Sequence, residues 1–277
     1  MNKKRNLLLT ILVVAAVFAI NFFTGEIFNG IAKNNKYLAD FLIEFKCAAL
    51  AVLGAVILKK MWIYRRFDTA LLKKGWTAAL PELYIVLSSI YNFLASRQGI
   101  SAGPADILLF VLMMICVGVY EETLFRGLLQ NAFHEFFGED TVGHVILAVV
   151  CAGVCFGSLH LVNTFRPGVS FSDAAIQACS ACGAGIYFGA IYFRTGKNLW
   201  FVMLVHGIHD TVVFLVQGAL SGTDSSAVIA QSSQNTNMIS AIIQAAVFAA
   251  IGLFLLRKNK VEPLLKKTEN TGGVSCA

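Results

Sequence analysis

The stretch Ala105–Leu129 reads ADILLFVLMMICVGVYEETLFRGLL, an apolar run whose second half carries two adjacent glutamates and an arginine. Its length exceeds the ~20 residues that an α-helix needs to cross the hydrocarbon core of a bilayer. No proline interrupts the chain from Ala105 to His134. We therefore expect one helix of about 30 residues, roughly 45 Å long, with ionisable groups inside a membrane span.

The rest of the chain has the same apolar character. Of its 277 residues, 57% are hydrophobic and 14% are charged, against roughly 25% charged in a typical soluble domain. Apolar runs of spanning length recur, which predicts an all-α fold, a polytopic transmembrane helical bundle of about eight spans. We place them at 7–23, 39–58, 80–97, 105–130, 144–165, 173–193, 198–219 and 237–256. We expect one integral-membrane domain over residues 1–260 and a disordered cytoplasmic tail over 261–277.

The net charge of +6 is explained by the predicted topology. Most of the 22 Lys and Arg residues fall on one side of the eight spans, and the other side holds only Lys33, Lys36, Arg97 and Arg166. The positive-inside rule describes this asymmetry, so both termini are expected to be cytoplasmic. The basic charge therefore gives no indication of a nucleic-acid partner.

The two ends of the chain and one internal segment carry further expectations. Leu7–Phe23 is longer than the apolar part of a signal peptide and no small-x-small cleavage site follows it, so we expect an uncleaved span. Met61–Leu80 alternates aromatic and basic residues, which suits a helix lying in the headgroup layer. The final four residues lack the leading cysteine of a prenylation signal, so the protein is not expected to be a prenylated substrate itself.

Ionisable groups inside spans are costly and usually functional, and the first cluster of them is Glu121-Glu122-Thr123-Leu124-Phe125-Arg126. Glu122 and Arg126 are four residues apart, so they share a helix face and can pair. Glu121 points about 100° away around the helix and is left for another role. A charged helix end leaving the membrane would explain a single glutamate better than it explains this pair and its arginine.

The second and third clusters bring histidines into two later spans. Phe156 and His160 lie one turn apart on one face, and so do His206 and Asp210. Gly207 leaves room beside His206 for a close neighbour, and we give His209 a packing or supporting role. Alone, His160 beside Ser158 would be explained as a hydrogen bond between helices.

Other polar or reactive features are not expected to do chemistry. His134 and His144 fall in the loop between the fourth and fifth spans, where we expect them to be solvated. Cys179 and Cys182 form a CxxC, but no second CxxC or suitably spaced histidine pair accompanies it. Nearby, Ala181, Gly185 and Gly189 form a stripe of small residues suited to close helix packing.

The three clusters together resemble the CAAX protease and bacteriocin-processing family (CPBP, or Abi) of intramembrane glutamic proteases, to which the Ras-converting CAAX endoprotease belongs. The family pattern EExxxR, FxxxH and HxxxN/D reads here as Glu121-Glu122…Arg126, Phe156…His160 and His206…Asp210. The resemblance covers about Ala105 to Leu215. Asp210 stands where the Ras-converting branch has asparagine, which puts the role of this position in doubt.

The resemblance implies an intramembrane endopeptidase, an integral multi-pass protein of a bacterial cell membrane whose cavity opens to the cytoplasm. Its substrates would be membrane-associated peptides or membrane-anchored precursors, of CAAX or of bacteriocin or pheromone type, with no metal or other cofactor. Glu121 and His160 would hold and deprotonate the water, and His206 would donate to the oxyanion. Glu122, Arg126 and Phe156 would support them. An ionised Asp210 cannot donate, so it is either protonated or orients His206, and we favour the second.

Two alternatives stay open. His160, His206 and Glu121 could supply a His₂Glu zinc set, although no HExxH motif occurs. The chain could instead be a non-enzymatic scaffold or immunity protein, or a small transporter that relays protons. Inverted repeats would favour a transporter, and we find none in the sequence. Substrate identity and oligomeric state are not given by the sequence.

The predicted spans leave one geometric difficulty. At 1.5 Å per residue, Glu121 lies ~24 Å from the outer face and His160 ~24 Å from the inner face of a slab ~30 Å thick. The two depths agree only if residues 144–150 extend the fifth helix into the cytoplasm, or if the helices are strongly tilted.

Overall fold

The computed structural model describes residues 2–32, 35–67, 69–97, 99–165, 168–223 and 237–270, and this part of the chain is helical without a strand. The predicted polytopic helical bundle is therefore confirmed. The elements are α1 (Lys3–Ile31), α2 (Lys36–Ile57), η1 (Met61–Tyr64), α3 (Thr69–Ala78), α4 (Leu80–Ser96), α5 (Pro104–Glu122), η2 (Thr123–Gln130), α6 (Asn131–Phe137), α7 (Val142–Leu159), η3 (His160–Phe165), α8 (Phe171–Arg194), α9 (Leu199–Gln217), η4 (Ala219–Ser221), α11 (Met238–Leu255) and α12 (Lys258–Asn270).

Six segments of the described chain are long and apolar enough to cross a membrane: Lys3–Gly25, Pro104–Phe137, Val142–Phe165, Phe171–Arg194, Leu199–Gln217 and Met238–Leu255. A seventh is added if α3 and α4, which meet at an angle of 54°, form one bent span. The helix α2 carries Lys36, Asp40, Glu44 and Lys46 and is not among the six. The count of eight spans and the cytoplasmic side of the termini stay predictions.

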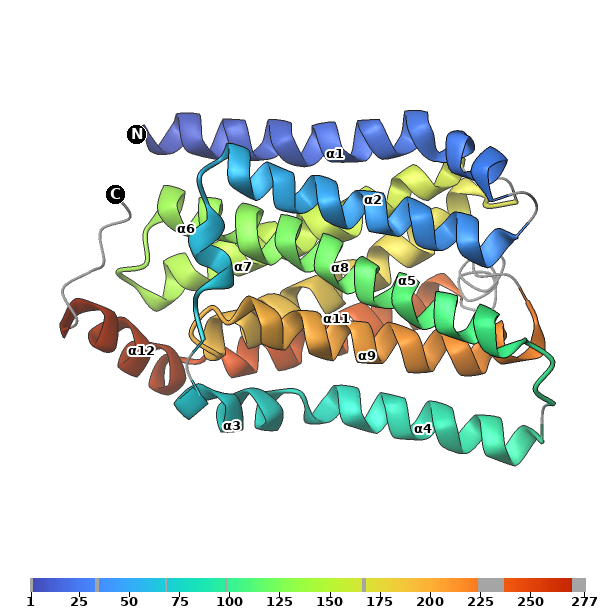
Figure 1. Ribbon diagram of the computed structural model, residues 1–277. Coiled ribbons are helices and arrows are strands. Elements are labelled where there is room, and N and C mark those ends of the chain that lie inside the picture. Colours follow the sequence, from blue (N-terminus) through green and yellow to red (C-terminus); the bar gives the residue numbers. More distant parts are fainter. Residues whose placement is uncertain are drawn as a thin grey trace.

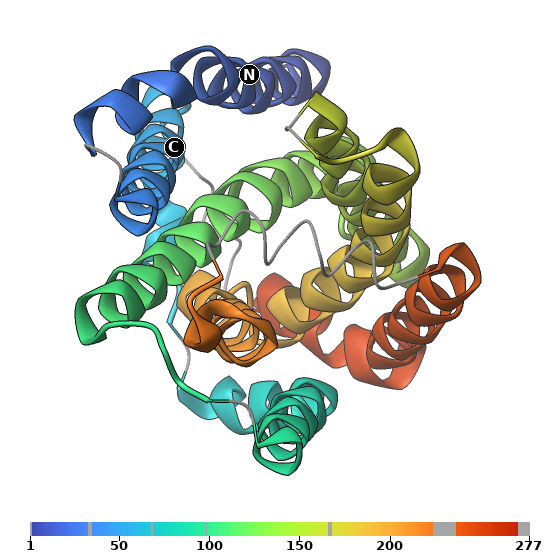
Figure 2. The ribbon, with the colours of Figure 1, turned by 90° about the vertical axis from the view of Figure 1, so that its right-hand side faces the viewer.

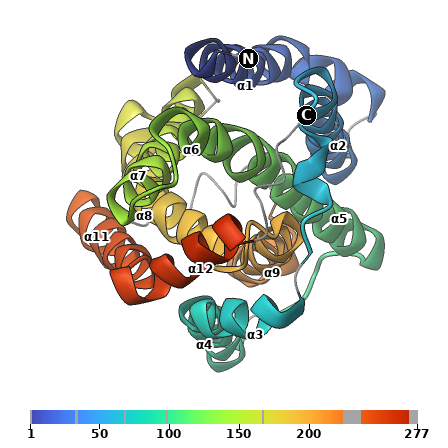
Figure 3. The same ribbon diagram turned by 90° about the vertical axis from the view of Figure 1, so that its left-hand side faces the viewer.

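The helices run side by side, and α5, η2 and α6 form one continuous helix through the middle of the bundle (Figure 1). Seen from the end, α1 and α2 lie on one side of this helix, and α7, α8 and α9 lie on the other (Figure 2). α11 packs on the outside of α8, and α4 packs beside α9 at the edge (Figure 3). The beginning of α1, the short helices α3 and α6, and α12 all lie at one end (Figure 1).

The central helix confirms the expected long fourth span but contains a π-helical stretch that the sequence did not predict. The eight residues of η2 adopt this wider turn, and all of them are buried. Such stretches inside α-helices are often found at functional sites. This stretch begins directly after Glu122 and contains Arg126, so it carries the first motif into the centre of the bundle.

Glycines let the helices that carry the motifs approach closely. A Cβ atom on Gly185 of α8 would lie 2.8 Å from Cα of Gly153 on α7, so the predicted small-residue stripe does pack closely. A Cβ atom on Gly118 of α5 would lie 3.0 Å from the carbonyl oxygen of Met203 on α9. These contacts bring backbones together where larger side chains would hold α5, α7, α8 and α9 apart.

The region after the last span differs from its expectation. Residues 258–270 form α12, in which Val261 is fully buried and packs with Leu256, Val145 and Val149. The structure therefore has a helix, with apolar side chains in the core, where a disordered tail was expected from residue 261; the boundary of the membrane domain stays a prediction. Residues 271–277 lie outside the described residues. The same contacts place the first turns of α7 beside the end of α11 and the start of α12.

Candidate active site

The first motif forms a buried ion pair, as its spacing predicts. The guanidinium Nη1 of Arg126 lies 2.9 Å from Oε1 of Glu122, and the two side chains are 2% and 0% exposed. The Arg126 guanidinium also lies over the ring of Phe156, 4.6 Å from its centroid, and near the ring of Phe188. The opposite charge of Glu122 and the aromatic face of Phe156 together reduce the cost of burying this arginine.

Glu122 has a second partner that the sequence did not reveal. The Nδ1–H of His206 donates to the same Oε1 of Glu122 at 2.7 Å, across from α9. The imidazole is stacked on Phe188 with ring centroids 5.0 Å apart. Glu122 therefore does more than pair with Arg126, because it also fixes the ring plane of His206.

The other ring nitrogen of His206 faces two further carboxylates. Nε2 lies 3.3 Å from Oδ2 of Asp210, one turn along α9, and 3.7 Å from Oε2 of Glu121. A proton on Nε2 makes both of these contacts attractive. His206 thus stands at the junction of the first and third motifs, held by Glu122 on one side and directed toward Asp210 and Glu121 on the other.

The second motif joins this group through an aromatic ring. His160 caps the end of α7, and its Nδ1–H donates to the carbonyl oxygen of Phe156 at 3.1 Å. The ring of Phe156 lies edge-on to His160 at 5.1 Å and to His206 at 6.3 Å between centroids. The three motifs therefore meet at one place in the bundle.

The members of the site differ in their exposure. Glu122 and Arg126 are enclosed, whereas the side chains of Glu121 and Asp210 keep exposed fractions of 18% and 14%. A reacting molecule must reach the group that acts on it, so the two carboxylates with remaining exposure are the ones suited to contact a substrate or water. Glu122 and Arg126 are placed to hold the others.

One residue near the site was not identified from the sequence. Glu82 of α4 is only 4% exposed, and its carboxylate forms an ion pair with Nδ1 of His209 on α9. His209 has the supporting position that was expected, but its partner was not foreseen. Glu82 is the single acidic residue within residues 80–97, and an isolated carboxylate in a span is itself a signal that could have found it.

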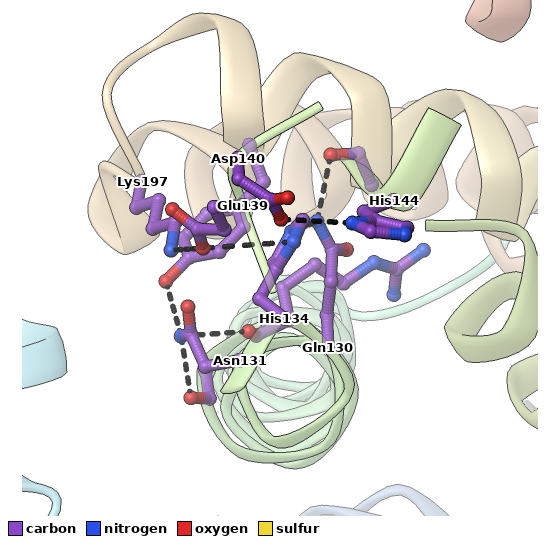
Figure 4. Close-up of polar contacts among 11 residues, drawn as sticks. Gln130, Asn131, His134, Glu139, Asp140, His144 and Lys197 are labelled. Atoms are coloured by element: carbon purple, nitrogen blue, oxygen red, sulfur yellow. Dashed lines mark hydrogen bonds and ion pairs between the residues drawn. The ribbon is translucent and has the colours of Figure 1, made fainter. Parts of the chain in front are cut away.

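A second polar cluster, which we call the end cluster, lies where α6 meets the loops on either side of α7 and α8 (Figure 4). It consists of Gln130, Asn131, His134, Glu139 and Lys197. Glu139 pairs with the Nζ of Lys197 and lies 3.5 Å from Nδ1 of His134. Gln130 donates to the carbonyl oxygen of Gly189 at 3.1 Å, and Asn131 donates to the hydroxyl of Tyr192 at 2.8 Å. Burial lowers the pKa of Lys197, an effect that Glu139 opposes.

The two histidines expected to be solvated behave differently. His134 is 2% exposed, so that expectation is wrong for it, because the helix continues through Phe137 and places His134 on its inner face. The side chain of His144 is 43% exposed, in line with the expectation, and Nδ1 of its ring lies 2.8 Å from Oδ1 of Asp140 (Figure 4).

Metal ligation was an open alternative for the site. Within the described ranges, no group of three or more His, Cys, Asp or Glu side chains is arranged to hold a metal ion. Nδ1 of His206 and Oε1 of Glu122 are hydrogen-bonded to each other. Cys179 and Cys182 are both free thiols. The donor set of the site therefore gives no support to a zinc centre.

Comparison with known proteins identifies the region that holds these motifs. Residues 103–212 match the family of type II CAAX prenyl endopeptidases described as Rce1-like. The matched segment begins just before α5 and ends within α9, so it contains all three motifs and leaves α1–α4 and α11–α12 outside. No curated protein matches the chain.

Proposed function

The chain carries an Rce1-like domain and belongs, through it, to the CAAX peptidase family, and on this premise we propose that it is an intramembrane endopeptidase of the glutamic type. The observation that carries the proposal is the surrounding of His206, which contacts Glu122 through one ring nitrogen and faces Glu121 and Asp210 through the other. Such an arrangement offers a base and an oxyanion donor side by side.

Glu121 is the proposed general base. Its carboxylate is accessible while that of Glu122 is enclosed by Arg126 and His206. Glu121 takes a proton from a water molecule whose oxygen attacks the scissile carbonyl carbon. Nδ1–H of His160 donates to the Phe156 carbonyl, so in the neutral ring Nε2 carries the lone pair, and we propose that it accepts from the same water. When the C–N bond breaks, the proton on Glu121 passes to the leaving amine.

His206 is the proposed donor to the developing oxyanion. Its Nε2–H points between Asp210 and Glu121, and a carbonyl oxygen placed there would receive it. A donor fixed before the reaction stabilises the charge without reorganisation. Glu122 holds the ring from the opposite side, and Asp210 orients Nε2. This is the role that suits an aspartate at this position, since an ionised carboxylate cannot donate to an oxyanion itself.

The proposed substrates are peptides held at a bacterial cell membrane, either CAAX-type C-termini or precursors of the bacteriocin or pheromone type. The proposed cavity opens to the cytoplasm. Because the matched family is one of CAAX prenyl endopeptidases, a peptide with a prenylated CAAX C-terminus is the first substrate to test. An unmodified peptide of the same sequence separates recognition of the prenyl group from recognition of the peptide.

The test is cleavage by purified protein in liposomes, followed by mass spectrometry of a prenylated CAAX peptide and its unmodified counterpart. General base catalysis contributes about 10²- to 10⁴-fold, so Glu121→Gln and His160→Ala should each lower kcat by at least ~100-fold without lowering the unfolding temperature. Glu262→Gln is the matched control: this side chain of α12 is 43% exposed and pairs with Lys258, and the variant should cleave normally. EDTA should have no effect. Retained cleavage by folded Glu121→Gln would sink the proposal.

A further inference from the structure

Helix α4 stands at the edge of the bundle and is held by few buried side chains. It packs along α9 and is set apart from the other long helices (Figures 1 and 3). Along its length only Glu82 and Val86 are buried, whereas Tyr84 and Tyr91 are 74% and 70% exposed. The buried carboxylate is thus an exception on a helix that otherwise presents apolar surface outward.

The position of Glu82 is costly unless it serves a purpose. A carboxylate that is 4% exposed must be paired to remain ionised, and its partner is the imidazole of His209. A leucine at this position would cover the same face of α9 without that cost. The buried charge of Glu82 therefore suggests a role beyond the packing of α4, one exerted through its partner His209.

His209 directly precedes Asp210 on α9, and its Nδ1 pairs with the carboxylate of Glu82. Oδ2 of Asp210 lies 3.3 Å from Nε2 of His206. On α5 and η2, which pack against α9, the charged groups of the site are Glu121, Glu122 and Arg126. Asp210 thus contacts the imidazole of His206 and follows that of His209 in the chain. Of these two imidazoles, the one of His209 pairs with a carboxylate from α4.

We propose that Glu82 is a positioning residue, which holds His209 so that the carboxylate of Asp210 is directed to Nε2 of His206. This inference rests on the proposed function. Without Glu82, the imidazole of His209 loses the carboxylate that pairs with it, and the carboxylate of Asp210, the next residue in the chain, becomes an alternative partner in competition with His206. His206 then loses the carboxylate that orients its Nε2–H. Glu82 lies outside the matched segment 103–212, so the family match does not assign it.

A purely structural role makes a different prediction, and the chain offers a control for it. The hydroxyl of Tyr187 on α8 donates to the carbonyl oxygen of Ala78 at 2.8 Å, directly before α4 begins. Tyr187→Phe removes this attachment of the α3–α4 junction and leaves the charge of Glu82 in place. If Glu82 served only to hold α4, both substitutions would have the same kinetic effect.

The experiment measures kcat and KM for the peptide cleaved by the wild type, with Glu121→Gln as the inactive reference. Misplacement of a reacting group costs up to about 10²-fold, so Glu82→Gln should lower kcat on the order of tenfold and leave KM unchanged. Glu82→Asp should recover most of the rate because it restores the charge. Glu82→Gln/His209→Gln should be no slower than Glu82→Gln, since the competing imidazole is gone. Tyr187→Phe should keep the wild-type kcat.

Three outcomes would overturn the inference: wild-type kcat in Glu82→Gln, an equal loss in Tyr187→Phe, or a double variant whose losses multiply. In each of these cases the wild type still cleaves and Glu121→Gln does not, so the proposed function stands. If instead Glu121→Gln cleaves like the wild type, the proposed function fails first, and the role of Glu82 fails with it.

Discussion

The central helix carries two buried polar clusters, and they are built from the same kinds of residue. The active-site cluster (Glu121, Glu122, Arg126, His206 and Asp210) surrounds an imidazole with carboxylates, and the end cluster places Glu139 between Lys197 and His134. In the end cluster one carboxylate faces one lysine. In the active-site cluster three carboxylates share one arginine and one histidine.

The difference teaches how to separate a structural cluster from a reactive one. The Glu139 contacts join the loop after α6 to the loop after α8, and the carboxylate of Glu139 pairs with the ammonium of Lys197 (Figure 4). In the active-site cluster, Glu121 and Asp210 share one imidazole nitrogen and keep partial exposure. Carboxylates in excess of cations, with access from outside, are suited to take up a proton. The Glu139 side chain is 30% exposed, more than Glu121 or Asp210, so access alone does not separate the two clusters. A carboxylate that is balanced by a cation is suited to hold two segments together.

The largest expected effect comes from Arg126→Met, which tests whether the active-site cluster also holds the fold. Removing one partner of a fully buried pair leaves a charge without compensation and costs about 3–5 kcal/mol. Glu122 keeps His206 as a partner, so we expect the lower part of this range. The unfolding temperature in detergent should fall strongly, and cleavage should be lost.

The matched variant for this prediction is Arg126→Met/Glu122→Gln. It removes the orphaned carboxylate and should recover part of the stability without recovering cleavage, because His206 has lost its support. An Arg126→Met protein with the wild-type unfolding temperature would show that the pair does not stabilise the fold. The active-site cluster would then serve the reaction alone, and the end cluster the structure alone.

A smaller effect, on stability alone, is expected for Lys197→Met in the end cluster. Glu139 is 30% exposed, so water can partly solvate the carboxylate left behind, and we expect a loss of about 1–3 kcal/mol, below that of a fully buried pair. The kcat per folded molecule should not change. Lys258→Met breaks an exposed pair on α12 and should change stability by less than ~1 kcal/mol. A fall in kcat for folded Lys197→Met would show that the end cluster also contributes to the reaction, which would contradict its purely structural role.

The contacts between residues of the same helix could be predicted from the sequence. The four-residue spacing predicts the Glu122–Arg126 pair and the contact of His206 with Asp210, and both occur. The long apolar run predicts the central helix. Spacing within a helix fixes which side chains share a face, so these contacts need no knowledge of how helices pack.

Contacts between helices could not be predicted in the same way. The bond from His206 to Glu122 depends on how α5 and α9 cross at Gly118 and on the π-helical turn that follows Glu122. The burial of His134 depends on a helix that continues past the expected boundary of the span. Glu82 was overlooked because its partner lies on a helix more than 100 residues later in the chain.

The smallest effect should come from Asp140→Asn, and it tests which property of a polar pair matters. Oδ1 of Asp140 lies 2.8 Å from Nδ1 of His144, closer than the 3.5 Å between Glu139 and His134, but the Asp140 and His144 side chains are 70% and 43% exposed. The hydrogen bond from His144 lowers the pKa of Asp140 below its usual range. A carboxylate whose pKa is lowered on folding contributes stability above its unfolded value of about 3.9, and that contribution is lost as the pH falls through the folded value.

Solvent screens an exposed pair, so the contribution should be small even where it is fully present. The unfolding temperatures of the wild type and Asp140→Asn should differ only slightly from about pH 5 to 7 and converge as the pH approaches ~3. Cleavage should be unchanged throughout. If Asp140→Asn destabilised the protein as much as Lys197→Met, burial would not decide the strength of such a pair, because the Asp140–His144 pair is much more exposed. If it does not, burial decides, and the pairs of the two clusters owe their importance to the helices around them.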